Sequence, residues 1–186
     1  AVISADKMNV VYRGVDNPIT ISMPGVPNNK ISASAPGLSR SGSAWVMRPG
    51  QGKDVTITVS GEIDGQRFSS SKLFRIKNIP RASGSMGGMI GDAKLPKQNV
   101  GVLPVMAVLE DFDFDLKLQV NEFKVFIPGQ PSIIVKGGKF NEQARAAVAR
   151  AKRGDKIQVF DIKASIVGNS SLKLPPVSPI IIEITN

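Results

Sequence analysis

The chain has 186 residues, of which 41% are hydrophobic, and it carries a formal net charge of +9. This length fits two small domains or one larger one, and the composition is that of a folded protein. Cysteine and histidine are both absent. Disulfides, thiolate metal sites, histidine-ligated zinc and histidine-based catalytic triads are therefore excluded. No apolar run approaches the roughly 18 residues that a membrane helix needs.

The first 80 residues have the pattern of short strands separated by glycine and proline turns. The clearest strand is 53–60, where Val55, Ile57 and Val59 alternate with threonines. This density of strands is typical of a small Ig-like sandwich. Trp45 is either a core residue of that sandwich or an exposed anchor at an interface. We predict strands at 9–12, 19–23, 31–34, 53–60, 66–70 and 72–77.

The segment 81–91, RASGSMGGMIG, has the composition of a flexible linker or a surface loop. Its glycines superficially match a phosphate-binding loop, but Pro96 follows where a phosphate loop continues into a helix. We therefore place the domain boundary at Pro80, so that the two domains span 1–80 and 81–186.

The second half contains the longest period-two pattern of the chain, Asp111–Val120. Apolar residues from Phe112 to Val120 alternate with polar residues, which predicts a half-buried antiparallel strand. Its three aspartates would stand about 7 Å apart along a strand, too far apart to hold one calcium ion without other ligands. A solvated face is the favoured interpretation of Asp111, Asp113 and Asp115. Further strands are predicted at 124–127, 132–135, 156–164 and 180–185.

One helix is predicted, over residues 141–153. Asn141 is a suitable N-cap, the residues that follow are strong helix formers, and Gly154 is a natural stop. The expected fold class is mainly β, with two consecutive small β-rich domains. The first is an Ig-like sandwich, and the second is a β domain with this one short helix.

No catalytic, cofactor or metal site is predicted. A Ser-x-x-Lys spacing occurs three times, at Ser4/Lys7, Ser69/Lys72 and Ser170/Lys173, which indicates chance in a chain rich in both residues. None of the three opens a helix.

The candidate partner-binding surface is a basic cluster that places five cations within twelve residues. Such a cluster favours an acidic partner, although cations also stabilise the C-terminal end of a helix without any partner. Few aromatic residues are interleaved with the charges, so we do not expect nucleic-acid binding. The cluster consists of Arg145, Arg150, Lys152, Arg153 and Lys156.

The order of several motifs resembles the GldM/PorM family over nearly the whole chain. The opening DKMNVVYRGVDNP, residues 6–18, is similar to the third periplasmic domain of that family, as are ITIS from Ile19 and ISAS from Ile31. FDFDLK from Phe112, GDKI from Gly154, DIKA from Asp161 and the Ile-rich terminal strand are similar to its C-terminal domain. The first motif is the most specific.

This resemblance implies a non-enzymatic component of the type IX secretion system, which also powers gliding in many Bacteroidetes. In the family, an N-terminal membrane helix sits with GldL/PorL in a proton-driven motor of the inner membrane. The periplasmic domains form a dimeric shaft whose C-terminal end meets the outer-membrane-associated GldK/PorK–GldN/PorN ring.

For this chain we expect a parallel homodimer in the periplasm that binds the ring proteins through its second domain. We expect contact with the motor only through an N-terminal part absent from this sequence, and no cofactor or membrane insertion. The alternative is a secreted carbohydrate- or surface-binding β-sandwich pair. That function needs an exposed aromatic platform, for which Trp45 and Tyr12 are the main candidates.

Overall fold

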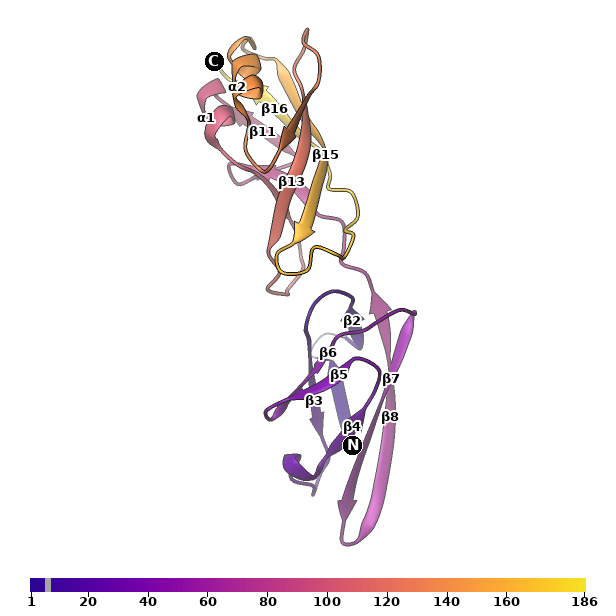
Figure 1. Cartoon of the computed structure of the whole chain (residues 1–186). Helices are drawn as coiled ribbons and strands as arrows, with labels where there is room; N and C mark the ends of the chain where they lie inside the picture. Colours follow the sequence, from indigo (N-terminus) through magenta and orange to yellow (C-terminus); the bar gives the residue numbers. More distant parts are fainter. Residues whose placement is uncertain (6–7) are drawn as a thin grey trace. The chain divides into compact units, whose positions relative to one another are not determined.

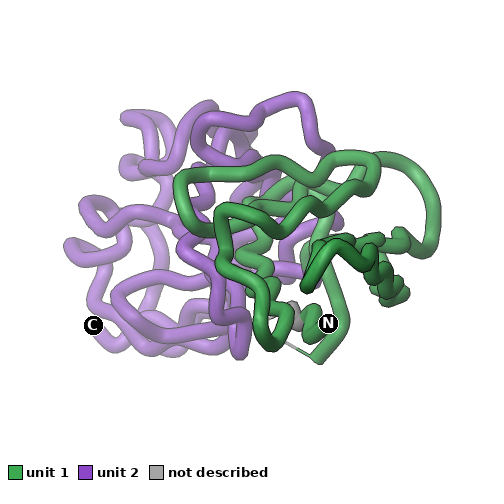
Figure 2. Tube along the Cα trace, turned by 90° about the horizontal axis from the view of Figure 1, so that it is seen from below, with its two compact units in different colours: residues 1–79 green, residues 80–186 purple. Residues whose placement is uncertain are grey.

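The computed structural model describes residues 1–5 and 8–186 and is mainly β, as predicted (Figure 1). The chain divides into two compact units, residues 1–79 and 80–186, coloured separately in Figure 2. Each unit has its own cluster of buried hydrophobic residues.

The first unit contains eight strands in two four-stranded sheets, ordered β1-β3-β6-β5 and β2-β8-β7-β4. This arrangement matches an Ig domain when the strands are lettered in chain order. The first sheet then has the order A-B-E-D, formed by β1, β3, β6 and β5, and the second contains C, F and G, formed by β4, β7 and β8. The short β2 pairs in parallel with β8. The Ig-like sandwich is therefore confirmed by its topology. The elements are β1 (Val2–Ala5), β2 (Val10–Tyr12), β3 (Asn17–Ser22), η1 (Asn28–Lys30), β4 (Ser32–Ser34), β5 (Leu38–Ser41), β6 (Ala44–Met47), β7 (Asp54–Ile63) and β8 (Gln66–Lys77).

The core of this sandwich lies between the two sheets. Alternate residues of β7 (Val55, Ile57 and Val59) are buried, as the sequence pattern predicts, and they share a core with Trp45 and Met47 of the opposite sheet. Two separate strands predicted at 66–70 and 72–77 are in fact the single strand β8. Strands β5 and β6 were not predicted, because β5 has only one apolar residue and gains its order by pairing with β6.

The second unit contains a five-stranded sheet, β11-β16-β15-β13-β14, and a three-stranded sheet, β10-β9-β12. Only β11 and β16 pair in parallel among these strands. Buried residues from both sheets and from α2 form one core. The elements are β9 (Ser83–Met86), β10 (Met89–Ile90), β11 (Asp92–Leu95), α1 (Lys97–Val102), β12 (Val105–Val108), β13 (Leu118–Phe126), β14 (Ile133–Lys136), α2 (Glu142–Ala149), β15 (Lys156–Ile166) and β16 (Ile180–Ile184).

The strand predicted over Asp111–Val120 is wrong for its first seven residues, because β13 begins only at Leu118. Alternate residues from Phe112 are nevertheless half-buried and exposed, as expected of the pattern. Asp111 has a positive φ of 52°, and no strand of the described chain pairs with 111–117. The period of two therefore reflects alternating burial in an irregular segment, where the rings of Phe112 and Phe114 lie 4.9 Å apart.

The segment 81–91 is not a flexible linker. It forms the β9–β10 hairpin, in which Ser85 and Met86 are buried. Gly87 and Gly88 turn the hairpin with positive φ angles, whereas Gly84 lets two backbones approach. A glycine-rich composition has the same appearance in a linker and in a tightly packed hairpin, so composition misled the prediction.

Helix α2 begins as predicted, because the Asn141 side chain accepts a hydrogen bond from the Ala144 N–H at 2.8 Å. Its predicted end at Arg153 is wrong, since α2 ends at Ala149. The Asp155 carboxylate accepts a hydrogen bond from the backbone N–H of Lys152 at 2.7 Å, which stabilises a turn instead of a further helical turn. The six-residue α1, not predicted from the sequence, contacts α2. No helix in residues 1–5 and 8–186 is long and apolar enough to span a membrane.

Candidate interaction surfaces

The predicted basic cluster follows the end of α2 and the turn after it. Arg145 lies on α2, Arg150 at its C-cap, Lys152 and Arg153 in the turn, and Lys156 at the start of β15. All five residues are exposed. The five residues therefore lie in one short stretch of the chain, on a helix, at its C-cap, in the turn that follows and on a strand.

Arg150 differs from the rest of the cluster because it is held in place. Its Nη2 and Nε donate to Gln130 Oε1 at 2.8 and 3.3 Å, and Gln130 Nε2 donates to the Ala147 carbonyl oxygen at 2.9 Å. Arg150 thus ties the turn after β13 to the end of α2. Its charge also faces the helix C-terminus, which is a favourable position for a cation.

The side chains of the other four cations of the cluster form no hydrogen bond or ion pair in the part of the chain that the structure describes. The nearby Asp155 carboxylate is engaged by the Lys152 backbone. The aliphatic part of Arg145 packs beside Gly101 of α1, where the Arg145 Cγ would lie 3.4 Å from an added Cβ. These side chains can therefore present positive charge to an anionic partner, which accelerates association more than it adds affinity.

A second charged group lies on the outer face of the five-stranded sheet. Glu122 of β13 accepts hydrogen bonds from Lys136 of β14 and from Lys163 of β15, the latter at 2.6 Å. The Glu122 side chain is only 13% exposed. Its pKa is lowered to about 2; the hydrogen bond from Lys136 is the largest cause, and the hydrogen bond from Lys163 is the next largest. This triad links three strands and has an internal partner for every charge, so it stabilises the sheet.

The sequence analysis missed this triad because its members come from three strands. Glu122 lies opposite Lys136 of β14 and Lys163 of β15, and the register with β15 contains two shifts along β13, at Val120/Glu122 and Glu122/Lys124. A bulged register of this kind has no signature in hydrophobic alternation.

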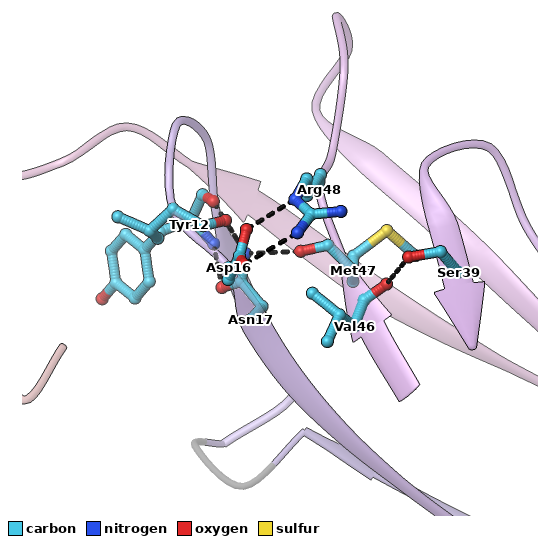
Figure 3. A network of polar contacts seen from close by, with 8 residues as sticks. Tyr12, Asp16, Asn17, Ser39, Val46, Met47 and Arg48 are labelled. Atoms are coloured by element: carbon cyan, nitrogen blue, oxygen red, sulfur yellow. Dashed lines mark hydrogen bonds and ion pairs between the residues drawn. The ribbon is translucent and has the colours of Figure 1, made fainter. Parts of the chain in front are cut away.

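The most specific part of the family resemblance, the motif at 6–18, folds into a polar network (Figure 3). Asn17 is 2% exposed and accepts a hydrogen bond from the Tyr12 N–H at 2.7 Å. Its Nδ2 donates to the carbonyl oxygens of Tyr12, Val15 and Met47 at 2.8, 3.0 and 3.0 Å. The amide therefore joins the turn after β2 to β6. Residues 6 and 7 of the motif lie outside the described residues.

Two charged residues of the same motif also make internal contacts. Asp16 forms a two-point ion pair with Arg48, with distances of 2.6 and 2.8 Å, and the hydrogen bonding that Arg48 donates to Asp16 is the main cause that raises the Arg48 pKa (Figure 3). Arg13 donates to the carbonyl oxygens of Gly50 and Gly52 at 2.9 and 2.8 Å, and to the Asn78 side chain. The described part of this motif thus stabilises the fold of the sandwich.

The residues of the other candidate sites are not arranged as a metal-binding or catalytic site in the described chain. The exposed Asp111, Asp113 and Asp115 do not form a metal-binding group, and no set of three or more acidic residues among the described positions does so. Lys72 of one Ser-x-x-Lys pair donates to the Ile3 carbonyl oxygen at 2.8 Å and packs over the Phe74 ring. It is therefore held by the fold.

Trp45 is a core residue. It is 9% exposed, and the Arg40 guanidinium lies 5.3 Å from its ring centroid. Its indole cannot serve as a flat platform for a sugar, which removes the main support for the carbohydrate-binding alternative.

Comparisons with known proteins divide the chain as follows. The family model described as the GldM third domain matches residues 1–77, and the one described as the GldM C-terminal domain matches residues 78–185. No curated protein is similar enough in sequence to match the chain.

Two solved structures with remote likeness were found. The fibronectin(III)-like modules of Clostridium thermocellum CbhA share 13% identity with a TM-score of 0.30, covering 99% of this chain and 94% of that one. Mouse protocadherin-24 EC1-3 shares 13% identity with a TM-score of 0.22, covering 84% of this chain and 58% of that one. Neither likeness carries an argument about function.

Proposed function

Because the chain belongs to the GldM family of gliding and type IX secretion components, we propose that it is a non-enzymatic structural and interaction segment of a periplasmic dimeric shaft. The shaft links an inner-membrane, proton-driven motor to an outer-membrane-associated ring. The observation that carries this proposal is the order of the two family matches, third domain and then C-terminal domain, over residues 1–185.

A role without catalysis is supported by the polar groups of the described chain. Histidine and cysteine are absent, and the main polar clusters are satisfied internally. Asn17 holds a turn, Arg13 holds a loop, and Glu122 joins three strands. These contacts stabilise two rigid β units, which is what a segment that transmits force requires.

Contact with the ring is supported by the basic cluster of the second unit. Four exposed cations without internal partners, Arg145, Lys152, Arg153 and Lys156, would attract an acidic surface on a GldK/PorK- or GldN/PorN-type protein. Contact with a GldL/PorL-type motor protein would require the N-terminal part of the full-length protein. No nucleic acid is proposed as a partner.

Dimerisation is supported by the size of the units. A domain of 80–110 residues buries only about two-thirds of the surface that its unfolded chain exposes, so it gains stability from packing against a second copy. Light scattering of the 186-residue chain at micromolar concentration should report about twice 19.8 kDa. A monomer at that concentration would contradict a dimeric shaft for this segment.

The carbohydrate-binding alternative is tested by the fluorescence of Trp45. A core indole emits at short wavelength, and its emission should not change when soluble sugars are added. A sugar-dependent shift would favour the alternative over the shaft.

A further inference from the structure

Strand β8 leaves most of one backbone edge unpaired. It pairs with β7 along Gln66–Arg75 on one side, and with β2 only at Arg75–Lys77 on the other. Among the described residues, no strand pairs with 66–74 on that second side, and Figure 1 shows β8 at the margin of its sheet. We call residues 66–74 the free edge of β8.

Two backbone hydrogen bonds indicate which residues face outward. The Arg75 N–H donates to the Asn9 carbonyl oxygen on the β2 side, at 3.1 Å, and the Ile76 N–H donates to Lys53 on the β7 side, at 2.7 Å. Alternate residues of a strand direct their N–H and C=O groups to opposite sides. Because the register with β7 has no shift, the odd-numbered residues of the free edge point their backbone groups outward. These residues are Arg67, Ser69, Ser71 and Leu73.

Two large apolar side chains flank the free edge. Phe68 is 47% exposed and Leu73 is 58% exposed. Five positions apart on a strand, they lie on opposite faces of β8. An added strand would therefore meet an apolar contact on each face. Proteins commonly protect such edges with proline, a β-bulge or charged side chains, and the free edge has only the last of these.

The charges of the free edge select among strands that could pair with it. It carries Arg67 and Lys72 and no acidic residue. Arg67 forms no ion pair with Glu62, its neighbour on β7, within the described structure. Opposite charges across a strand pair stabilise it and like charges destabilise it. A second copy of this edge would bring only further cations. An acidic strand would complement Arg67, and also Lys72, whose ammonium donates to the neutral Ile3 carbonyl oxygen but has no carboxylate partner among the described residues.

We propose that the free edge of β8 binds an extended acidic segment of a partner protein as an added strand. Backbone hydrogen bonds to Arg67, Ser69, Ser71 and Leu73 supply affinity, and the flanking side chains supply selectivity. An antiparallel partner would place carboxylates five residues apart, opposite Lys72 and Arg67. The site lies wholly within residues 1–79, so it is independent of the ring contact proposed for the second unit.

The probe is the capped peptide Thr-Val-Glu-Thr-Thr-Thr-Val-Glu-Thr, whose glutamates have this spacing, with a matched peptide in which lysines replace both glutamates. Amide hydrogen exchange of the 186-residue chain is measured with each. The acidic peptide should protect the amides of 67, 69, 71 and 73. The even-numbered amides between them, already bonded to β7, should change little. The lysine peptide should protect none.

A pair of variants separates the edge from the side chains. Ser69→Pro removes one outward N–H without removing a β7 hydrogen bond, and it should weaken binding of the acidic peptide about tenfold. Ser69→Thr keeps the N–H and should bind like the wild type. The melting temperatures of both variants are compared to confirm folding.

Several results would overturn the proposal. These are equal protection by both peptides, no alternating protection, and equal binding by the folded Ser69→Pro and Ser69→Thr variants. Protection of the four odd-numbered amides without peptide would show that the chain covers the edge itself. If that protection grows with protein concentration, the occupant is a second copy.

Discussion

The side-chain amide of Asn17 donates a hydrogen bond to the carbonyl oxygen of Met47, thirty positions later in the chain, at 3.0 Å. The same amide accepts from and donates to the backbone of Tyr12. A single buried side chain thus joins the turn between β2 and β3 to strand β6 of the sandwich.

Replacement of this amide should strongly destabilise the first unit. Asn17→Leu keeps the approximate volume but leaves the Tyr12 and Met47 backbone groups buried without partners, and each such group costs about 1–3 kcal/mol. We expect the free energy of unfolding of the first unit to fall by about 3–5 kcal/mol in chemical denaturation.

Asp16→Asn is the matched control, because it weakens the neighbouring exposed ion pair with Arg48 and leaves the amide network in place. It should cost less than about 1 kcal/mol. Equal effects of the two substitutions would show that the network does not stabilise the sandwich.

The Glu122 triad predicts a pH dependence of stability. The pKa of Glu122 is about 2 in the folded chain and 4.5 in its unperturbed state. A lowered pKa stabilises the folded state above the unfolded value, and this contribution is lost as the pH falls from about 4.5 towards 2. Glu122→Gln should therefore make the unfolding free energy of the second unit less sensitive to pH in this window.

Glu183→Gln is the control for this measurement. Glu183 lies on the same sheet but contacts Lys94 only at 3.9 Å. The variant should keep the pH dependence of the wild type between pH 4.5 and 2. If Glu122→Gln also keeps it, the triad does not form in solution.

A tightly packed glycine in the β9–β10 hairpin gives a third prediction. The Gly84 N–H donates to the Ser178 carbonyl oxygen at 3.0 Å, and a Cβ at this position would lie only 2.5 Å from that oxygen. Gly84→Ala should destabilise the second unit by about 2–4 kcal/mol, because a backbone oxygen cannot move aside easily.

Gly88→Ala serves as the comparison in the same hairpin. Gly88 has open space around its Cα but a φ of +79°, so alanine there should cost about 1 kcal/mol of conformational strain. Calorimetry of the two variants tests whether close packing or turn geometry matters more. A larger effect at Gly88 would contradict the packing at Gly84.

Strand β7, the segment 111–117 and the glycine hairpin show what the sequence could and could not reveal. Alternation predicted the buried face of β7, because the two faces of a sandwich strand differ from each other in polarity. The same rule failed for 111–117, where alternating burial occurs without a neighbouring strand. Composition failed for the hairpin at 83–90, since it cannot distinguish a flexible glycine from one at a close backbone contact.

The functional surfaces were predicted unevenly for a similar reason. The basic cluster is contiguous in sequence, so its five residues could be named, although the end of α2 was placed four residues too late. The Glu122 triad and the free edge of β8 depend on which strands pair. Strand order and register arise from long-range packing, which a single sequence does not display.

The basic cluster gives a fourth prediction. Reversal of Lys152 and Arg153 to glutamate leaves the Arg150–Gln130 contact in place. Exposed charges mainly steer association, so the double variant should bind ring proteins with a slower association rate and a weaker salt dependence. The dissociation rate should change little. An unchanged association rate with an intact fold would place the ring contact elsewhere.

A control with the same charge change at another site isolates this effect. Lys53 and Lys77 are exposed residues of the first unit, and their reversal changes the net charge by the same amount. This variant should reduce the association rate less than the reversal in the cluster. Equal reductions would indicate general electrostatic attraction rather than a local surface.

The most direct test of the shaft segment is an equilibrium titration of the whole 186-residue chain against a purified GldK/PorK–GldN/PorN-type ring complex. The account predicts saturable binding that weakens with salt and is reduced by reversal of Lys152 and Arg153. A folded chain that shows no binding to the ring complex at tens of micromolar and low salt would contradict it.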